Sequence, residues 1–231
     1  VSFVNRVSHE LGAPLTNLRL YMELARDSLP PEAGESARRI SVAQEENERL
    51  IRLVQNVLTF ARSERQKLEL HPAPCRPAEI LTAVLDQFSP ALARRGIVVE
   101  TSLDDTLAAT LDHDAFAQIV ANRVSNVEKY AASGGWMFAA LVAEGDALVL
   151  RISDRGPGIP DGESARVFLP FERLDSRLTE GVTGTGLGLA ITRDLATRMH
   201  GTITLAPSEE GTGCVFTVRL PLNELTTHSP A

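Results

Sequence analysis

The chain has 231 residues, of which 43% are hydrophobic and 23% charged, so its composition suits a packed core and argues against disorder. Its longest unbroken apolar run, Trp136–Ala143, is far too short to span a bilayer. The net charge of −7 argues against a nucleic-acid-binding protein, which needs a basic patch. Two cysteines, Cys75 and Cys214, predict neither a disulfide framework nor a metal cluster, and they fit a reducing cytoplasm.

Two amphipathic helices joined by a turn at Pro30–Gly34 are predicted for residues 1–64. Hydrophobic or small residues recur with alternating spacings of three and four, which predicts a heptad seam on each helix. Two such helices cannot bury both seams alone, so we expect a homodimer that forms a four-helix bundle. Asn47 falls on the second seam, where one buried polar residue often fixes the register. The seam positions are Val4, Val7, Leu11, Pro14, Leu18, Tyr21, Ala25, Ile40, Ala43, Asn47, Leu50, Val54, Val57 and Ala61.

A second domain is predicted for residues 77–222, after a polar linker over 65–76 and before a polar tail over 223–231. Helical patterns and short β-rich runs alternate within it, which predicts a sheet with helices packed on one face. The expected helices are Pro77–Gly96, Asp114–Ala131 and Leu187–His200. The expected strands are Ile97–Thr101, Leu107–Leu111, Trp136–Ala143, Ala147–Asp154, Thr202–Ala206 and Cys214–Leu220.

His9, followed by Glu10, is the first candidate for chemistry. The seam of the first helix places His9 on the solvent side, where imidazole is a good nucleophile near neutral pH and Glu10 can accept its proton. Pro14 removes one helical hydrogen bond and predicts a kink just after this pair. The alternative is that His9 and Glu10 are ordinary surface residues.

Asn122, Asn126 and Lys129 form a polar stripe on one face of the helix expected at Asp114–Ala131. Apolar residues cover the opposite face, namely Phe116, Val120, Val124 and Val127. Two amides and a lysine can hold a metal-bound phosphate, because Mg²⁺ accepts an amide oxygen together with phosphate oxygens. A solvated helix face is the alternative interpretation.

Two glycine-containing segments complete the set of candidates. Asp154–Gly158 follows a predicted strand, so its carboxylate can accept a hydrogen bond from an exocyclic amine such as that of adenine, although this pattern is also a common turn. Gly184–Leu189 opens a predicted helix, where backbone N–H groups can hold phosphate. It matches neither the dinucleotide fingerprint nor the Walker loop. The irregular segment 159–183 between the two is long enough to predict a lid.

Taken together and in this order, the segments resemble the transmitter region of a sensor histidine kinase of two-component signalling. Ser8–Thr16 resembles the H box, Asn122–Lys129 the N box and Asp154–Gly158 the G1 box. Val167–Arg173 resembles the F box and Gly184–Leu189 the G2 box. The resemblance covers the chain from about Val1 to Pro221.

The resemblance implies a dimerisation and histidine-phosphotransfer hairpin followed by an α/β sandwich of the Bergerat type with a mixed sheet, which binds ATP and Mg²⁺. It implies that His9 accepts the γ-phosphoryl group with help from Glu10, and that Arg173 stabilises charge on that group. It further implies that Asn126 binds Mg²⁺ and Asp154 reads adenine. The remaining nucleotide-site residues that it implies are Asn122, Lys129, Gly156, Gly158, Phe171, Gly184, Thr185, Gly186, Leu187 and Gly188.

Departures from the family pattern qualify these expectations. Related ATPases carry a water-activating Glu where this chain has Asn122, which favours transfer to His9 over hydrolysis. Gly12 and Ala13 replace the usual Arg and Thr or Ser after the His-Glu-Leu run, so we expect a flexible helix and weak phosphatase activity toward the regulator. Arg123 and Val127 stand where relatives have Leu and Ala, and Arg123 lies near enough to the polar face to touch nucleotide or lid.

The expected partners are a second copy of the chain and the receiver domain of a response regulator, with no nucleic acid and no membrane contact. Because the chain begins at Val1, we expect a cytoplasmic fragment of a longer inner-membrane sensor. The alternatives are a degenerate, non-catalytic nucleotide-binding scaffold, favoured by Gly12 and Ala13, and a stand-alone ATPase.

Overall fold

A computed structural model describes residues 3–30, 33–64, 68–160, 162–172, 186–208 and 212–222. The chain divides into two compact units, Val1–Leu68 and Glu69–Ala231.

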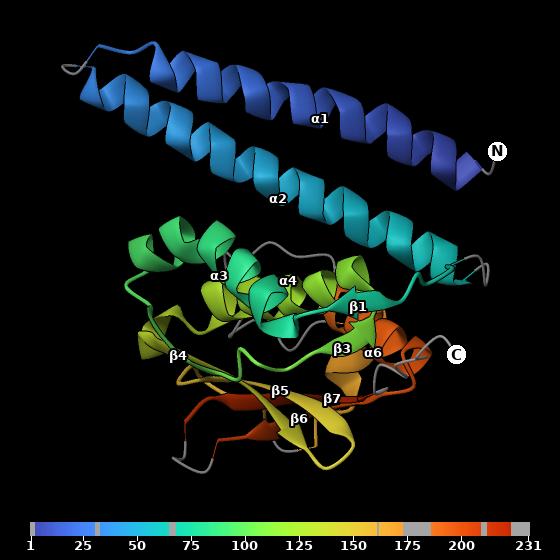
Figure 1. The fold of residues 1–231 in the computed structure, drawn as a ribbon. Helices are drawn as coiled ribbons and strands as arrows, with labels where there is room; N and C mark the ends of the chain where they lie inside the picture. Colours follow the sequence, from blue (N-terminus) through green and yellow to red (C-terminus); the bar gives the residue numbers. More distant parts are fainter. Residues whose placement is uncertain are drawn as a thin grey trace. The chain divides into compact units, whose positions relative to one another are not determined.

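The first unit is a hairpin of two long helices, α1 (Phe3–Asp27) and α2 (Gly34–Glu64), as the heptad pattern predicts (Figure 1). Asn47 of α2 is 2% exposed, and its Nδ2 donates a hydrogen bond of 2.9 Å to the carbonyl of Leu15 in α1. Its Oδ1 is buried without a hydrogen-bond partner within the described part of the chain. Asn47 is therefore a buried polar contact between the two helices.

The second unit contains a mixed sheet of five strands in the order β2-β4-β5-β7-β6. Strands β2 and β4 are parallel and the other neighbours are antiparallel, which confirms the expected mixed sheet. All six expected strands are present, with ends shifted by at most two residues. The strands are β2 (Val98–Leu103), β3 (Ala109–Leu111), β4 (Trp136–Glu144), β5 (Ala147–Asp154), β6 (Thr202–Pro207) and β7 (Cys214–Pro221).

Three helices, α3 (Pro77–Arg94), α4 (His113–Tyr130) and α6 (Gly188–Arg198), pack on one face of this sheet (Figure 1). The N-terminus of α4 is capped by Asp112, whose Oδ1 accepts the N–H of Ala115 at 2.8 Å. The apolar face expected for α4 is fully buried at Phe116, Val120, Val124 and Val127. This burial fixes the rotation of α4, and with it the direction of the polar stripe. Two short 3₁₀ turns, η1 (Ala132–Gly134) and η2 (Arg166–Phe168), complete the second unit.

Part of the segment expected as a linker is tied to the second unit. Strand β1 (Ala73–Cys75) pairs antiparallel with β3. Just before it, the backbone N–H of His71 donates a hydrogen bond of 2.6 Å to Oδ2 of Asp112. A strand of three residues with a central proline gives no periodic signal, which is why the sequence did not predict it.

Among the described residues, no helix has both the length and the hydropathy that a membrane span requires.

Candidate functional site

Asp154 ends the central strand β5 and is only 4% exposed. Its Oδ1 accepts a hydrogen bond of 2.8 Å from the backbone N–H of Gly156. The turn Gly156–Gly158 directly after it stops the strand, because a proline lies between the two glycines. The carboxylate is thereby held at the end of β5, the strand end at which the sequence pattern predicted it.

The two predicted glycines of this turn lie against other backbone. A Cβ on Gly156 would lie 2.7 Å from the Cβ of Ala131, at the end of α4. Gly158 has φ +76°, and a Cβ there would lie 3.3 Å from the carbonyl oxygen of Gly213. Glycine at both positions therefore lets the turn pack against its neighbours.

Two further glycines around Asp154 were missed by sequence reasoning. A Cβ on Gly213, which has φ +91°, would lie 1.9 Å from the carbonyl oxygen of Asp154. A Cβ on Gly134 would lie 2.0 Å from the carbonyl oxygen of Arg155. Neither glycine belongs to a motif, so only the three-dimensional approach of the loops identifies them.

The polar stripe of α4 is not a solvated face along its whole length. Asn122 is 8% exposed, while Asn126 and Lys129 are half-buried. The Nδ2 of Asn122 donates to the carbonyl of Gly188 at 3.2 Å and to Oγ1 of Thr192 at 3.4 Å. Asn122 thus binds α4 to the first turn of α6.

The carbonyl of Gly188, at the start of α6, accepts a second hydrogen bond in addition to that from Asn122. Thr192, fully buried, donates its hydroxyl to the carbonyl of Gly188 at 2.8 Å. A Cβ on Gly188 would lie 3.7 Å from the amide carbon of Asn122, so the two elements approach closely. Leu187, just before the helix, is 1% exposed. Thr192 is a third residue that sequence reasoning missed, after Gly134 and Gly213.

Arg123, next to Asn122 on α4, forms a buried ion pair with Asp154. Its Nη2 donates to Oδ2 of the carboxylate, and the two side chains are 7% and 5% exposed. The guanidinium also lies over the ring of Phe216 in β7, 5.6 Å from the centroid. Sequence reasoning placed Arg123 at the edge of the polar face and did not predict its pairing with Asp154.

The thiol of Cys214 in β7 is close enough to Asp154 and Arg123 for their charges to affect its pKa. Burial raises the pKa of this thiol, and the negative charge of Asp154 raises it further, while Arg123 opposes that effect. Cys214 is therefore a protonated, buried side chain beside the ion pair.

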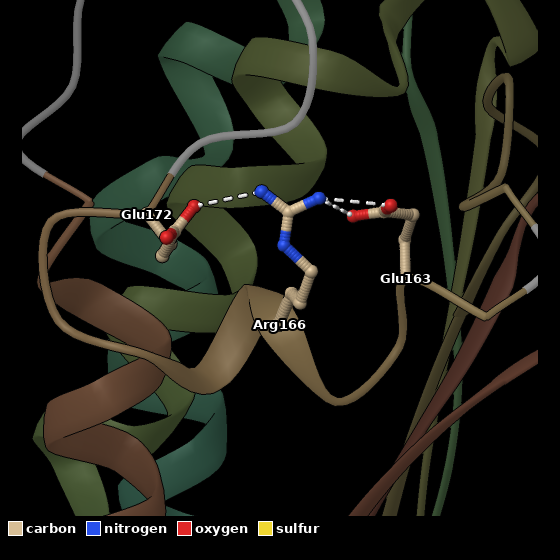
Figure 2. A network of polar contacts seen from close by, with 3 residues as sticks. All are labelled: Glu163, Arg166 and Glu172. Carbon is tan, nitrogen blue, oxygen red and sulfur yellow. Dashed lines mark hydrogen bonds and ion pairs between the residues drawn. The ribbon is translucent and has the colours of Figure 1, made fainter.

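The segment predicted as an F box is organised by a small polar network (Figure 2). Arg166 in η2 contacts both carboxylate oxygens of Glu163, at 2.9 and 2.8 Å, and Glu172 at 3.2 Å. Phe171 has φ +64° and is 66% exposed, and Gly186 has φ +69°. The aromatic ring of Phe171 is thus exposed rather than buried in the core.

Several predicted residues lie outside the described part of the chain or are described only by backbone. His9 and Glu10 lie within α1, but their side chains are not among those described. Arg173, Gly184 and Thr185 lie outside the described residues.

Asn126 fits a magnesium ion that is shared with a phosphate. Its amide is half-buried on the polar stripe of α4. The described ranges contain no cluster of three or more His, Cys, Asp or Glu side chains placed to hold a metal. Mg²⁺ bound to a nucleotide takes most ligands from phosphate and water, so one amide oxygen is an adequate protein contribution.

Two consecutive residues of α4 therefore join segments that are distant in sequence. Asn122 contacts Gly188 at the start of α6, and Arg123 contacts Asp154 at the end of β5. A carboxylate acceptor, an amide-bearing helix face and a glycine-rich helix start consequently lie around one helix. This arrangement can bind a base at one end and phosphates at the other.

Two family models match the chain. Residues 1–66 match the His Kinase A (phospho-acceptor) domain. Residues 111–224 match the family described as histidine kinase-, DNA gyrase B-, and HSP90-like ATPase.

Curated relatives and a solved structure agree with these matches. Sensor histidine kinase WalK of Bacillus subtilis (strain 168) is 31% identical over 224 residues, which cover 96% of this chain and 36% of WalK. Sensor histidine kinase RcsC of Escherichia coli (strain K12) is 30% identical over 222 residues, 95% of this chain and 23% of RcsC. The crystal structure of full-length ShkA in complex with AMPPNP has a TM-score of 0.68 at 27% identity, and covers 94% of this chain and 45% of ShkA. The chain thus spans 36% or less of the length of these two curated relatives.

Proposed function

The chain belongs to the sensor histidine kinases as a transmitter region, and from this premise we propose that it phosphorylates His9 with ATP and passes the phosphoryl group to a response regulator. The observation that carries the proposal is the pair of contacts made by Asn122 and Arg123, which bring the G1-like and G2-like segments to one helix.

In the first step, a ring nitrogen of His9 attacks the γ-phosphorus of ATP. A nitrogen–phosphorus bond forms, the bond to the bridging oxygen breaks, and ADP leaves. The carboxylate of Glu10 takes the proton released from the imidazole, and Arg173 stabilises the charge on the transferred group. In the second step, an aspartate of the regulator's receiver domain takes the phosphoryl group from His9.

The nucleotide is assigned to the second unit. Asp154 accepts a hydrogen bond from the adenine amine, and Gly156 and Gly158 let the backbone approach the base. Asn122, Lys129 and the glycines of residues 184–188 lie on the phosphate side, and Phe171 docks the lid. Asn126 supplies an amide oxygen to Mg²⁺, which neutralises phosphate charge when bound. That ShkA was crystallised with AMPPNP supports an adenine nucleotide.

Transfer to His9 is favoured over hydrolysis to water. An amide cannot act as a general base, and the amide of Asn122 is already bonded to Gly188 and Thr192. The site therefore offers no carboxylate at the position where related ATPases activate water.

We assign the first unit to dimerisation. In the single chain, large apolar side chains of both helices are strongly exposed, which a second copy would cover by forming a four-helix bundle. They are Leu18, Leu20, Tyr21, Leu24, Val42, Leu50 and Val57, and their exposed fractions lie between 43% and 69%. The residues near His9 on this bundle would form the docking surface for the regulator. In the parent protein, this region is assigned to the cytoplasmic side, where ATP is available.

Incubation with γ-labelled ATP and Mg²⁺ tests the proposal. Acid-labile, base-stable label is expected on the wild type, but not on His9→Gln or Asn126→Asp. His113→Gln, which changes an exposed histidine at the start of α4, is the matched control and should keep the label. A wild type that binds ATP without taking up label would instead favour the non-catalytic scaffold, and phosphate release without label would favour an ATPase.

A further inference from the structure

Arg123 introduces a positive charge where the proposed function places the nucleobase. Its guanidinium pairs with Asp154, and both side chains are more than nine-tenths buried. The other carboxylate oxygen, Oδ1, already accepts the N–H of Gly156 at 2.8 Å. The acceptor assigned to the base thus has a strong donor directly beside it.

Stability does not account for this ion pair. Removing two charges from water costs several kcal/mol per ion, a cost that attraction offsets only when every donor is satisfied. Here the Nε–H of Arg123 is buried without a hydrogen-bond partner in the part of the chain that the structure describes. A ligand that carries an acceptor beside Asp154 would satisfy a guanidinium donor that the protein leaves unused.

The edges of the purines differ in the order of their donors and acceptors. Adenine presents an amine at position 6 and an acceptor at N1, whereas a 6-oxopurine presents an oxygen at position 6 and an N–H donor at N1. A carboxylate alone repels the oxygen, because both groups are acceptors. A carboxylate with a guanidinium beside it can accept the N1–H and donate to the oxygen at the same time.

We propose that Arg123 is a specificity-determining residue that makes the base site accept 6-oxopurine nucleotides, those of inosine and guanosine, as well as ATP. The inference rests on the proposed function, since it takes Asp154 as the residue that reads the base. Arg123 donates one N–H to Asp154 and another to the oxygen at position 6.

The first test uses the wild-type chain alone. Titration calorimetry with ATP, ITP and GTP, each with Mg²⁺, gives three affinities. We expect ITP to bind within about tenfold of ATP, a difference of about 1.4 kcal/mol. The GTP affinity tests whether the site also admits a 2-amino group. If the chain binds ITP but not GTP, the role of Arg123 at the oxygen of position 6 is still supported. An ITP affinity more than a hundredfold below that of ATP overturns the proposal.

The second test uses Arg123→Leu and Arg123→Lys. A leucine has no donor, and a lysine nitrogen held by Asp154 lacks the planar fork that would reach a second acceptor. Both should lower the affinity for ITP relative to ATP by about 10- to 100-fold, the usual worth of a hydrogen bond to a charged group. Arg123→Lys keeps the buried charge pair, so it remains informative if Arg123→Leu does not fold.

Arg151→Leu is the matched control. Arg151 lies on the same strand as Asp154 and pairs with Glu144, but its side chain is 39% exposed. It should leave the ratio of ATP to ITP affinity unchanged. Emission of Trp136, the only tryptophan, checks the folding of each variant. An unchanged ratio in a folded Arg123 variant overturns the proposal.

Asp154→Asn distinguishes a failure of this inference from a failure of the proposed function on which it rests. If the wild type binds no nucleotide, or if Asp154→Asn binds ATP as well as the wild type does, the proposed base site itself is wrong. If Asp154→Asn loses ATP while the Arg123 variants keep the wild-type ratio, only the role of Arg123 is wrong.

Discussion

The backbone N–H of Phe171 donates a hydrogen bond of 3.0 Å to the carbonyl of Gly186. Both residues have a left-handed backbone, with φ of +64° and +69°. A Cβ on Gly186 would lie 2.8 Å from the carbonyl carbon of Phe171. Phe171, which lies within the segment predicted as a lid, is therefore joined by a backbone hydrogen bond to Gly186, at a point where only glycine fits.

Gly186→Ala should weaken ATP binding. The left-handed backbone costs any alanine about 1 kcal/mol or more, and here the methyl group would also separate Phe171 from the glycine-rich turn. Gly162→Ala is the control, since Gly162 has φ +80° with nothing within 4 Å of its Cβ position. Calorimetric affinities of the two variants should differ, and equal affinities would show that the Phe171–Gly186 contact has no part in nucleotide binding.

Asn47→Leu should raise the thermal stability of the helical hairpin. The buried Oδ1 of Asn47 lacks a partner within the described residues, and an unsatisfied buried polar atom costs about 1–3 kcal/mol. Asn47→Ala, which removes the amide but leaves a void, should lower the stability instead. Unfolding midpoints must be compared at equal protein concentration, because a dimer's stability depends on concentration. A leucine variant as unstable as the alanine variant would contradict this expectation.

Glu144→Gln should lower stability at neutral pH and have less effect in acid. Hydrogen bonds from Arg219 and Arg151 hold the pKa of Glu144 below its ordinary value of 4.5. Because the folded-state pKa is lowered, the stabilisation is present above about pH 4.5 and is lost as the pH falls through the folded-state value. Unfolding midpoints between pH 7 and pH 3 should therefore converge for the two proteins. Glu100→Gln, at an exposed position of β2, is the control, and a gap that stays constant with pH would disprove the linkage.

Ala13→Thr should increase the rate at which the chain dephosphorylates its regulator. Relatives with strong phosphatase activity carry a Thr or Asn at this position, where the polar group orients the attacking water, and alanine has no such group. The measurement is the loss of phosphate from a phosphorylated receiver domain with each protein. Equal rates for wild type and variant would contradict the expectation that Ala13 weakens the phosphatase activity.

The sequence predicted the architecture well where patterns are long or clearly bounded. Strand β5 was predicted with its observed ends, because Gly145 and Gly156 bracket an apolar run. The buried face of α4 followed from its helical period. Strand β1 could not be predicted, because only its pairing with β3 stabilises so short a segment.

The site was predicted less completely than the fold. The motif residues Asn122 and Asp154 were identified, but not the ion pair between Arg123 and Asp154, whose partners are far apart in sequence. Helical period places Arg123 at the edge of a face and says nothing of how far its long side chain reaches. Gly134 and Gly213 were not identified for a related reason. In the sequence, a glycine that is needed for close packing cannot be distinguished from any other loop glycine.

The place of β7 in the sheet has a consequence for synthesis on the ribosome. Of the strands that the structure describes, β7 is the last to be made, yet it lies between β5 and β6 in the interior of the sheet. Until residues 214–221 leave the ribosome, β5 has an open edge and β6 has no neighbour, so unpaired strand edges are exposed to other chains. The nucleotide-binding unit therefore cannot fold progressively from its N-terminus, and a chain that stops before β7 should be a target for chaperones and proteases rather than a partly active enzyme.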